Sequence, residues 1–278
     1  MSLNKKNKND IENLDYVILD VETTGLSPRA GDRIVEFAAI RVRHLKEIDR
    51  YETLIDPQRE ISYGAFQVNG ITSQLLSGAP KAEEVLEDIL HFIEGACLVG
   101  HNIPFDLKFL NNEFLLADHP APEGYPTIDT IKMARNLLPQ IGRYSLRAVA
   151  AYLGVKEQQR HRAMADVQMT YKIFCQLLKM AQAKHADNPS FFFEIFGAQK
   201  KDPRNQQIKR QKIKEAITAN HPVEFSYFSS NSGVTSRTVT PQELVGEGSG
   251  TLLVGFCHLR REKRIFKLEK MMDIMTHL

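Results

Sequence analysis

The period of the hydrophobic pattern changes along the chain, and this change restricts the folds that the chain can adopt. Three β-forming runs come first, joined by short links, which predicts an antiparallel meander. Helical patterns and short apolar runs then alternate, which predicts helices packed on a mixed sheet. The strand-like runs cover residues 16–19, 33–42, 47–55, 97–100 and 127–129, and the helical ones cover 82–93, 104–116, 145–153 and 163–181. The expected class is α/β, with a five-stranded mixed sheet flanked by helices.

The end of the chain predicts a second, mainly β domain, because a basic helical pattern at 208–219 precedes several β-type runs. These runs cover 223–228, 234–240, 251–258 and 265–268. Residues 184–205 carry Asn-Pro and Asp-Pro linker signals. The phenylalanines between these signals should dock on one domain, or else form a partner-binding peptide; they are Phe191, Phe192, Phe193 and Phe196. The predicted parts are a disordered tail at 1–10, a large domain at 11–182, a linker at 183–206 and a small β domain at 207–278.

The composition is that of a soluble globular protein, with 42% hydrophobic and 25% charged residues. No apolar run approaches the roughly 18 residues that a membrane helix needs, and the Lys- and Asn-rich start has no apolar signal-peptide core. The three cysteines form no C-x-x-C pair, which argues against a disulfide framework and a cysteine zinc site. These features predict a cytoplasmic protein without a membrane partner.

The charge is divided unevenly between the two predicted domains. Residues 200–278 hold 14 Lys and Arg against 8 Asp and Glu, whereas residues 1–199 hold 22 against 26. An acidic body with a basic end indicates carboxylates for metal in one part and cations for phosphate in the other. Ordinary solubilising charge on the last domain is the alternative.

Asp20 and Glu22 form the first candidate site. They stand two apart at the end of the apolar run 16–19, and alternate residues of a strand face the same side. Both carboxylates should therefore point together at the end of the strand, where they repel one another unless a cation lies between them. By itself this common D-x-E pattern favours two solvated carboxylates.

Two further acidic residues stand at predicted helix starts. Asp106 lies in a first helical turn, where free N–H groups favour an anion. Asp166 lies on the first turns of the long helix, and His161 lies in the polar loop before it, the arrangement of a movable general base beside a fixed metal ligand. Each alone fits an ordinary polar residue at a helix end. Three such motifs, each at the end of a predicted element, indicate one shared site.

In this order the motifs resemble those of the DEDDh subgroup of the DnaQ-like exonucleases, which have an RNase H-like fold. The resemblance covers about residues 15–181. The matching segments are 20–25, 101–106, 144–146 and 161–166. Residues 69–72 resemble a small loop of the family, with Asn69 where a histidine commonly precedes the glycine.

The resemblance implies a 3′→5′ exonuclease that hydrolyses single-stranded nucleic acid, DNA rather than RNA, to nucleoside 5′-monophosphates by two-metal-ion catalysis. It implies two Mg²⁺ ions about 4 Å apart, replaceable by Mn²⁺, and Mg²⁺ prefers hard oxygen ligands. Asp20 would bridge both ions, Glu22 and Asp166 would complete the first site, and Asp106 would support the second. His161 would deprotonate the attacking water, a task that suits an unperturbed histidine pKa near 6.5.

Substrate contacts follow from the same resemblance. Residues after the first motif should face the 3′-terminal nucleotide, and they are Thr23, Thr24, Gly25 and Leu26. His101 and Asn102 should also contact substrate. Phe105 either stacks on a base or packs into the core. The implied partners are single-stranded 3′ ends and polymerase or repair proteins.

The basic residues of the last domain come with β-type runs that resemble a WYL domain, a small β-barrel-like module of bacterial regulators, over about residues 208–275. Residues 251–253 read Thr-Leu-Leu where the family name expects Trp-Tyr-Leu. The family tends to bind nucleic acid or nucleotides through basic residues, and arginine can pair bidentately with phosphate. The candidates are Arg237, Arg260, Arg261 and Arg264. A solvated basic edge strand is the alternative.

Two other functions stay open at this point. One is a nucleic-acid-binding regulator whose nuclease fold is catalytically weak, and the other is a proofreading subunit of a DNA polymerase. The complete set of four acids and a histidine favours an enzyme, because a non-catalytic relative need not keep His161.

Overall fold

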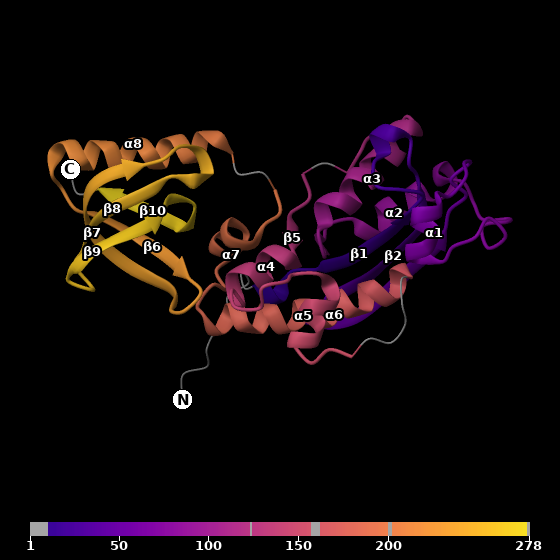
Figure 1. Cartoon of the computed structure of the whole chain (residues 1–278), viewed down its shortest axis with the longest axis horizontal. Helices are drawn as coiled ribbons and strands as arrows, with labels where there is room; N and C mark the ends of the chain where they lie inside the picture. The colour runs from indigo at the N-terminus through magenta and orange to yellow at the C-terminus, as the bar shows by residue number, and fades with distance from the viewer. Residues whose placement is uncertain (1–10, 123, 157–161, 200–201, 277–278) are drawn as a thin grey trace. The chain divides into compact units, whose positions relative to one another are not determined.

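The computed structural model describes residues 11–122, 124–156, 162–199 and 202–276. The chain separates into two compact units (Figure 1), which are described one at a time. The first contains the residues up to Lys179 together with Phe196–Ala198, and the second contains Met180–Ile195 and the residues from Gln199 onward. Among the residues that the structure describes, none of the helices combines the length and the hydropathy that a membrane span requires.

A mixed five-stranded sheet forms the centre of the first unit, in the order β3-β2-β1-β4-β5. Its strands are β1 (Tyr16–Thr23), β2 (Ile34–Arg43), β3 (Lys46–Leu54), β4 (Cys97–Gly100) and β5 (Thr127–Asp129). The first three strands pair antiparallel, whereas β4 pairs parallel to both β1 and β5. This arrangement confirms the predicted fold class, including the meander before the alternating strands and helices.

Helices surround this sheet (Figure 1). They are α1 (Tyr63–Asn69), α2 (Ala82–Ile93), α3 (Ile103–Leu116), α4 (Thr130–Leu137), α5 (Leu146–Tyr152) and the long α6 (Ala163–Ala183). Side-chain caps fix several helix starts. Ser145 accepts a hydrogen bond from the backbone N–H of Ala148 at the start of α5, and Asp129 accepts one from Ile131 at the start of α4. The hydrophobic pattern of the sequence predicts the other four of these helices but not α1 and α4.

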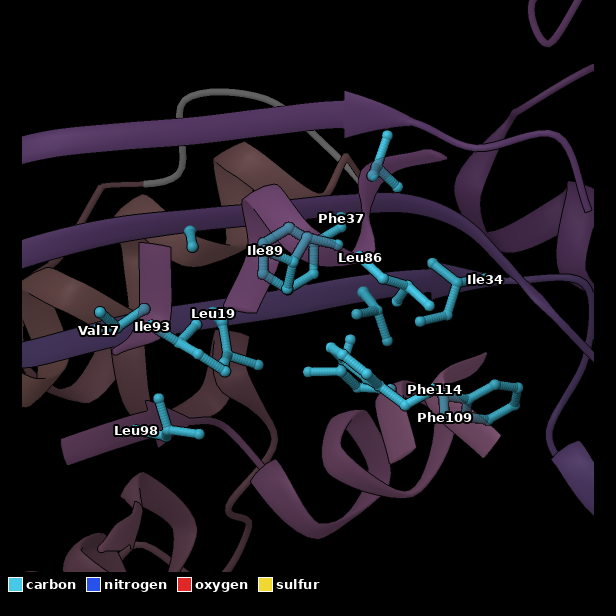
Figure 2. Close-up of a cluster of buried hydrophobic side chains, with 14 of the residues drawn as sticks. Val17, Leu19, Ile34, Phe37, Leu86, Ile89, Ile93, Leu98, Phe109 and Phe114 are labelled. Atoms are coloured by element: carbon cyan, nitrogen blue, oxygen red, sulfur yellow. The ribbon is translucent and has the colours of Figure 1, made fainter. Parts of the chain in front are cut away.

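The alternation of side chains along β1 separates the core from the site. Val17, Leu19 and Val21 point into a hydrophobic cluster with β2, α2 and α3. Figure 2 shows this cluster, in which Ile89 and Phe109 meet the strand side chains. The other set of β1 side chains faces α6, because the ring of Tyr16 lies 4.8 Å from that of Phe174. Asp20 and Glu22 belong to that second set by parity.

The segment predicted as a linker contains a helix, α7 (Pro189–Phe196). Its phenylalanines at 192 and 196 are fully buried, and Ile195 is 5% exposed. A partner-binding peptide would expose these rings, so their burial agrees with the docked-segment interpretation.

A second five-stranded sheet, entirely antiparallel, forms the second unit in the order β10-β6-β7-β8-β9. Its strands are β6 (Val223–Ser229), β7 (Gly233–Val245), β8 (Leu252–Cys257), β9 (Glu262–Lys267) and β10 (Met271–Thr276). The helix α8 (Pro203–Ala219) packs on the sheet through Ile213 and Ala216. This domain confirms the predicted mainly β end of the chain, although β10 was not predicted. Short 3-10 helices occur at Ile11–Asn13, Pro28–Ala30, Gly248–Gly250 and Leu268–Lys270.

Candidate active site

Three carboxylates meet between β1 and the start of α6. Ligand oxygens of Asp20, Glu22 and Asp166 all lie within 4.8 Å of one another. Asp20 and Glu22 reach this place because they share one face of β1, and Asp166 reaches it because it lies in the first turn of α6. All three are partly exposed, so the cluster can be reached from solvent. The structure thus brings together three of the four acids singled out in the sequence.

Asp106 lies beside this cluster in the first turn of α3. Its side chain is 3% exposed, and its Oδ1 accepts a hydrogen bond of 3.1 Å from the backbone N–H of Val21, between Asp20 and Glu22. This bond ties the start of α3 to the centre of the metal-site strand. His161 lies outside the described residues, so its place in the site stays a prediction.

The four acids repel one another strongly. Burial and then the charges of Asp106, Glu22 and Asp166 raise the pKa of Asp20 well above its usual range. Burial, followed by the charge of Asp166, raises the pKa of Glu22 to about 7. Burial likewise raises the pKa of Asp106 to about 8, although the Val21 hydrogen bond opposes the change. Such values indicate carboxylates whose charge needs a cation nearby.

The donor set fits a hard divalent cation. All donors of the cluster are carboxylate oxygens, the ligand type that Mg²⁺ and Mn²⁺ prefer, and no thiol or imidazole is among the three described ligands. The cluster therefore fits a metal site of the type that the sequence predicted. The geometry does not distinguish Mg²⁺ from Mn²⁺.

Glu36 is a residue near the site that the sequence analysis did not identify. It lies on β2 directly opposite Glu22 and is 3% exposed. Its carboxylate binds the guanidinium of Arg162 bidentately, with a shortest distance of 2.6 Å, and accepts the N–H of Ala163 at 3.0 Å. Glu36 thus fixes the first residue of α6, the helix that carries Asp166. The signal in the sequence is the single acid inside the apolar run 34–40.

Replacing Glu36 with alanine should lower both stability and activity. Loss of the ion pair and of the Ala163 cap should reduce the free energy of unfolding by about 1–3 kcal/mol, since partly exposed Arg162 can rehydrate. Asp166 would then be held less firmly, so metal affinity should fall by roughly tenfold to a hundredfold. Urea unfolding and calorimetric titration with Mn²⁺ measure the two effects. Glu87→Ala, an exposed position on α2, is the matched control, and equal behaviour of both variants would contradict the role of Glu36.

Asn69 also contacts the site. It is 4% exposed, and its amide donates to the Thr23 carbonyl oxygen at 3.3 Å and hydrogen-bonds Glu22, which partly offsets the raised pKa of that group. Its Oδ1 accepts the N–H of Ile71. In the sequence, Asn69 stands out only as a departure from a family pattern. The structure instead gives it a direct contact with one of the clustered carboxylates.

The residues after the first motif form a tight turn. The Thr23 hydroxyl donates to the Gly25 carbonyl oxygen at 2.6 Å, and the Thr24 hydroxyl accepts the N–H of Arg33 at 3.0 Å. A Cβ at Gly25 would lie 2.4 Å from the Asp32 carboxylate, so a larger residue would push that side chain away from its hydrogen bonds with Thr24 and Ser27. Leu26 is 82% exposed. The threonine hydroxyls therefore shape the turn, and the Leu26 side chain remains available for a ligand.

His101 and Asn102 are engaged in the fold. The Nε2–H of His101 donates to the Tyr144 carbonyl oxygen at 2.8 Å, and Nδ1 pairs with the Thr130 hydroxyl at 2.8 Å. Burial lowers the pKa of His101. Asn102 has a left-handed backbone (φ 73°), and its backbone N–H donates to the Asp129 carboxylate. The Asn102 side chain is exposed and does not take part in this hydrogen bond. Their predicted substrate contacts stay predictions.

Phe105 packs into the core, as one of the two alternatives predicted, and its stacking on a base stays a prediction. Its ring packs 4.9 Å from Phe109 and against the core cluster, yet the residue is only partly buried. Part of the ring is thus used in packing, and part of it remains accessible to solvent.

The basic residues of the second unit fall into two groups. Arg237, Arg260 and Arg264 line one pocket with a volume of about 510 Å³. Arg261 is exposed and is not part of this lining. Thr251, at the first position of the Thr-Leu-Leu stretch, is fully buried and binds Arg210 at 2.6 Å. That contact supports the fold of the domain.

Comparison with known proteins agrees with this geometry. The Exonuclease family model matches residues 17–174, more than half of the chain, and the WYL domain model matches residues 210–275. The DNA polymerase III PolC-type of Thermotoga petrophila is 37% identical over 172 residues, which are 61% of this chain and 12% of that protein. The 3′-5′ exonuclease DinG of Bacillus subtilis is 33% identical over 59% of this chain and 18% of that protein.

A solved structure, Exonuclease X in complex with 5′ overhanging duplex DNA, is 26% identical with a TM-score of 0.50. The match covers 63% of this chain and 98% of that chain. The chain spans only about an eighth of the length of the PolC-type relatives. The family matches and the carboxylate cluster together confirm the resemblance found in the sequence. The chain belongs to the Exonuclease family, as a DnaQ-like DEDDh member with a WYL domain after the nuclease fold.

Proposed function

We propose that the chain is a Mg²⁺-dependent 3′→5′ exonuclease that shortens single-stranded nucleic acid, DNA in preference to RNA, and releases nucleoside 5′-monophosphates. The observation that carries this proposal is the convergence of Asp20, Glu22 and Asp166 within 4.8 Å, with Asp106 held beside them. The raised pKa values of Asp20, Glu22 and Asp106 support a role in binding cations, because solvated surface carboxylates keep their ordinary pKa values.

The chemistry divides between the metal and the chain. Bound Mg²⁺ would supply the positive charge that stabilises the attacking and leaving oxygens of the phosphoryl group. Asp20, Glu22 and Asp166 would hold one ion, and Asp106 would help Asp20 to hold a second. His161 would take the proton from the attacking water, and its neighbour Arg162, fixed by Glu36, would place the start of α6.

Substrate binding would use the surface around the turn after β1. Leu26 is highly exposed, and Phe105 offers part of its ring, so an apolar contact from each could hold the unpaired 3′-terminal bases. Such contacts do not discriminate between bases, because every base has an aromatic face. This agrees with a nuclease that acts on strands of any sequence.

A digestion panel tests the proposal directly. Single-stranded and duplex DNA and RNA, labelled at the 5′ end, are incubated with protein and Mg²⁺, with EDTA as the control. Progressive shortening from the 3′ end, fastest for single-stranded DNA and absent in EDTA, is expected. Tight binding without shortening in either Mg²⁺ or Mn²⁺ would favour the regulator interpretation instead.

The second unit would bind nucleic acid through its pocket arginines. Exchanging Arg260 and Arg264 together for glutamine should reduce the salt dependence of strand binding, with a slope smaller by about 1.4 for single strands. Fluorescence anisotropy at several salt concentrations, in EDTA, measures this slope. Lys214→Gln, at an exposed position of α8, is the control. An unchanged slope in the double variant would remove these arginines from phosphate binding.

Association with a polymerase is a second candidate, because the PolC-type relative matches this chain over 172 residues. A proofreading subunit should excise a mismatched 3′ end faster when the polymerase is present. Excision rates that do not respond to the polymerase would contradict this role.

A further inference from the structure

Arg237 is a buried cation, and two of its guanidinium nitrogens have no hydrogen-bond partner among the described residues. The residue is 7% exposed, and its Nε and Nη1 are buried without a hydrogen-bond partner among the described residues. Nearly all buried side-chain donors in native proteins are paired, and an unpaired buried charge is strongly unfavourable. A donor pair left in this state therefore points to a ligand that completes it.

The strand places this arginine on the inner face of the sheet. Arg237 lies on β7 opposite Phe225, two residues before Val239, and both of these apolar residues belong to the buried core of the domain. Alternation along the strand would put an apolar residue here. An apolar side chain would satisfy the packing at position 237, so packing alone does not explain the arginine there.

The pocket around Arg237 is basic on one side and apolar on the other. Arg260 and Arg264 add two cations, whereas Tyr227, Ile265 and Phe266 supply the apolar wall. Polar residues from the turn 229–232 complete the lining, and no carboxylate is among the lining residues. The rings of Tyr227 and Phe266 lie 5.1 Å apart and almost perpendicular, which makes this wall rigid.

The charges that face the pocket remain mostly positive. The Nη1 of Arg264 donates a hydrogen bond of 2.8 Å to Glu262, and the negative charge of Glu269 acts on the Tyr227 hydroxyl. Burial raises the pKa of Tyr227, and the positive charges of Arg237 and Arg264 oppose that rise. Neither acid hydrogen-bonds the Nε or the Nη1 of Arg237. A dianion would therefore meet uncompensated positive charge at the base of the pocket.

We propose that this pocket binds a terminal phosphomonoester of a nucleotide, with the phosphate on Arg237 and the sugar or base against the Tyr227–Phe266 wall. A terminal phosphate carries close to two negative charges at pH 7 and has three free oxygens. It can enter a pocket to reach a buried guanidinium, whereas a phosphodiester inside a strand has chain on both sides. The volume of about 510 Å³ has room for one nucleotide.

This inference rests on the proposed nucleic-acid role of the second unit but not on nuclease activity. The ligand has two possible sources, a free nucleoside 5′-monophosphate or the 5′-phosphorylated end of a strand. Binding of the first would couple the domain to the product of the proposed reaction. Binding of the second would recognise the strand end opposite to the one that is shortened.

Calorimetric titration of the full-length Asp20→Asn protein in EDTA tests the pocket without turnover or metal-dependent binding at the nuclease site. The probes are dAMP, deoxyadenosine, inorganic phosphate, and one short oligonucleotide with and without a 5′-phosphate. At least one phosphomonoester should bind tenfold or more tightly than its unphosphorylated counterpart. Preference for dAMP identifies the free nucleotide as the source, and preference for the oligonucleotide identifies the strand end.

Variants connect binding to Arg237. Arg237→Met should weaken phosphomonoester binding at least tenfold, yet keep or raise the melting temperature, because it removes an unpaired buried charge. Arg237→Lys should recover part of the binding, and Lys263→Met, outside the lining on the same strand as Arg264, should leave it unchanged. Equal binding of phosphorylated and unphosphorylated probes, or full binding by Arg237→Met, would overturn the inference. In that case salt-dependent strand binding could still persist and would be measured separately.

Discussion

Replacing Asp20 with asparagine will reduce 3′-end shortening by roughly 10³-fold or more at saturating Mg²⁺. The expected loss is large because Asp20 is the carboxylate on which the charges of all three other acids act, those of Asp106, Glu22 and Asp166. Asparagine keeps the size of the side chain but removes the charge needed to hold a divalent cation. Single-turnover digestion of a labelled strand measures the rate constant.

The fold of the Asp20→Asn protein should survive, because the substitution removes a repelled charge from a crowded acidic site. Its melting temperature in EDTA should equal or exceed that of the unmodified protein. Asp88→Asn, an exposed aspartate on α2, serves as the control and should digest at the normal rate. Undiminished digestion by Asp20→Asn would place the chemistry elsewhere in the molecule.

Metal affinity will rise steeply with pH between pH 6 and pH 8. The pKa of Glu22 is raised to about 7 and that of Asp106 to about 8, so at pH 6 both carboxyls carry protons that an ion must displace. The apparent affinity should therefore increase by about 10²–10³-fold over these two pH units. Titration with Ca²⁺ or Mn²⁺ in a series of buffers, without nucleic acid, measures the change and the protons released.

Stability without metal should follow the opposite trend. Because the folded-state pKa of Glu22 exceeds its unfolded value near 4.5, the folded protein binds more protons than the unfolded chain between about pH 4.5 and 7. This contribution to stability is present at low pH and is lost as the pH rises through 7. Added Mn²⁺ should thus raise the melting temperature more at pH 8 than at pH 6. A stabilisation by metal that is independent of pH would contradict the assignment of Glu22 as a ligand.

Local pattern predicted the elements whose side chains face a core. The helix α2 begins and ends at the predicted residues because its apolar positions follow one helical stripe. The strand β4 is likewise a short, wholly buried apolar run. By contrast, α1 exposes Tyr63 and Val68 and so lacks that stripe. The strand β10 was missed because methionine, which occurs three times in it, has little β preference.

The candidate site was accessible to sequence reasoning in part. Alternation along one strand placed Asp20 and Glu22 together, and this needs no knowledge of the rest of the fold. The ion pair between Glu36 and Arg162 joins residues 126 positions apart, so only the packing of α6 on β2 reveals it. The sequence likewise does not reveal that Arg237 has buried, unpaired guanidinium nitrogens, because this depends on the residues that surround it in the fold.

The edge strand β3 has a consequence for solubility at high concentration. Within the described residues β2 is the one strand that pairs with it, so its other side can receive an extended segment that approaches. Acidic and basic side chains crowd this strand, including the exposed ion pair of Glu47 and Arg50. A foreign strand would have to strip water from these charges before it could pair. These charges therefore protect the edge strand of the nuclease sheet from aggregation by strand addition.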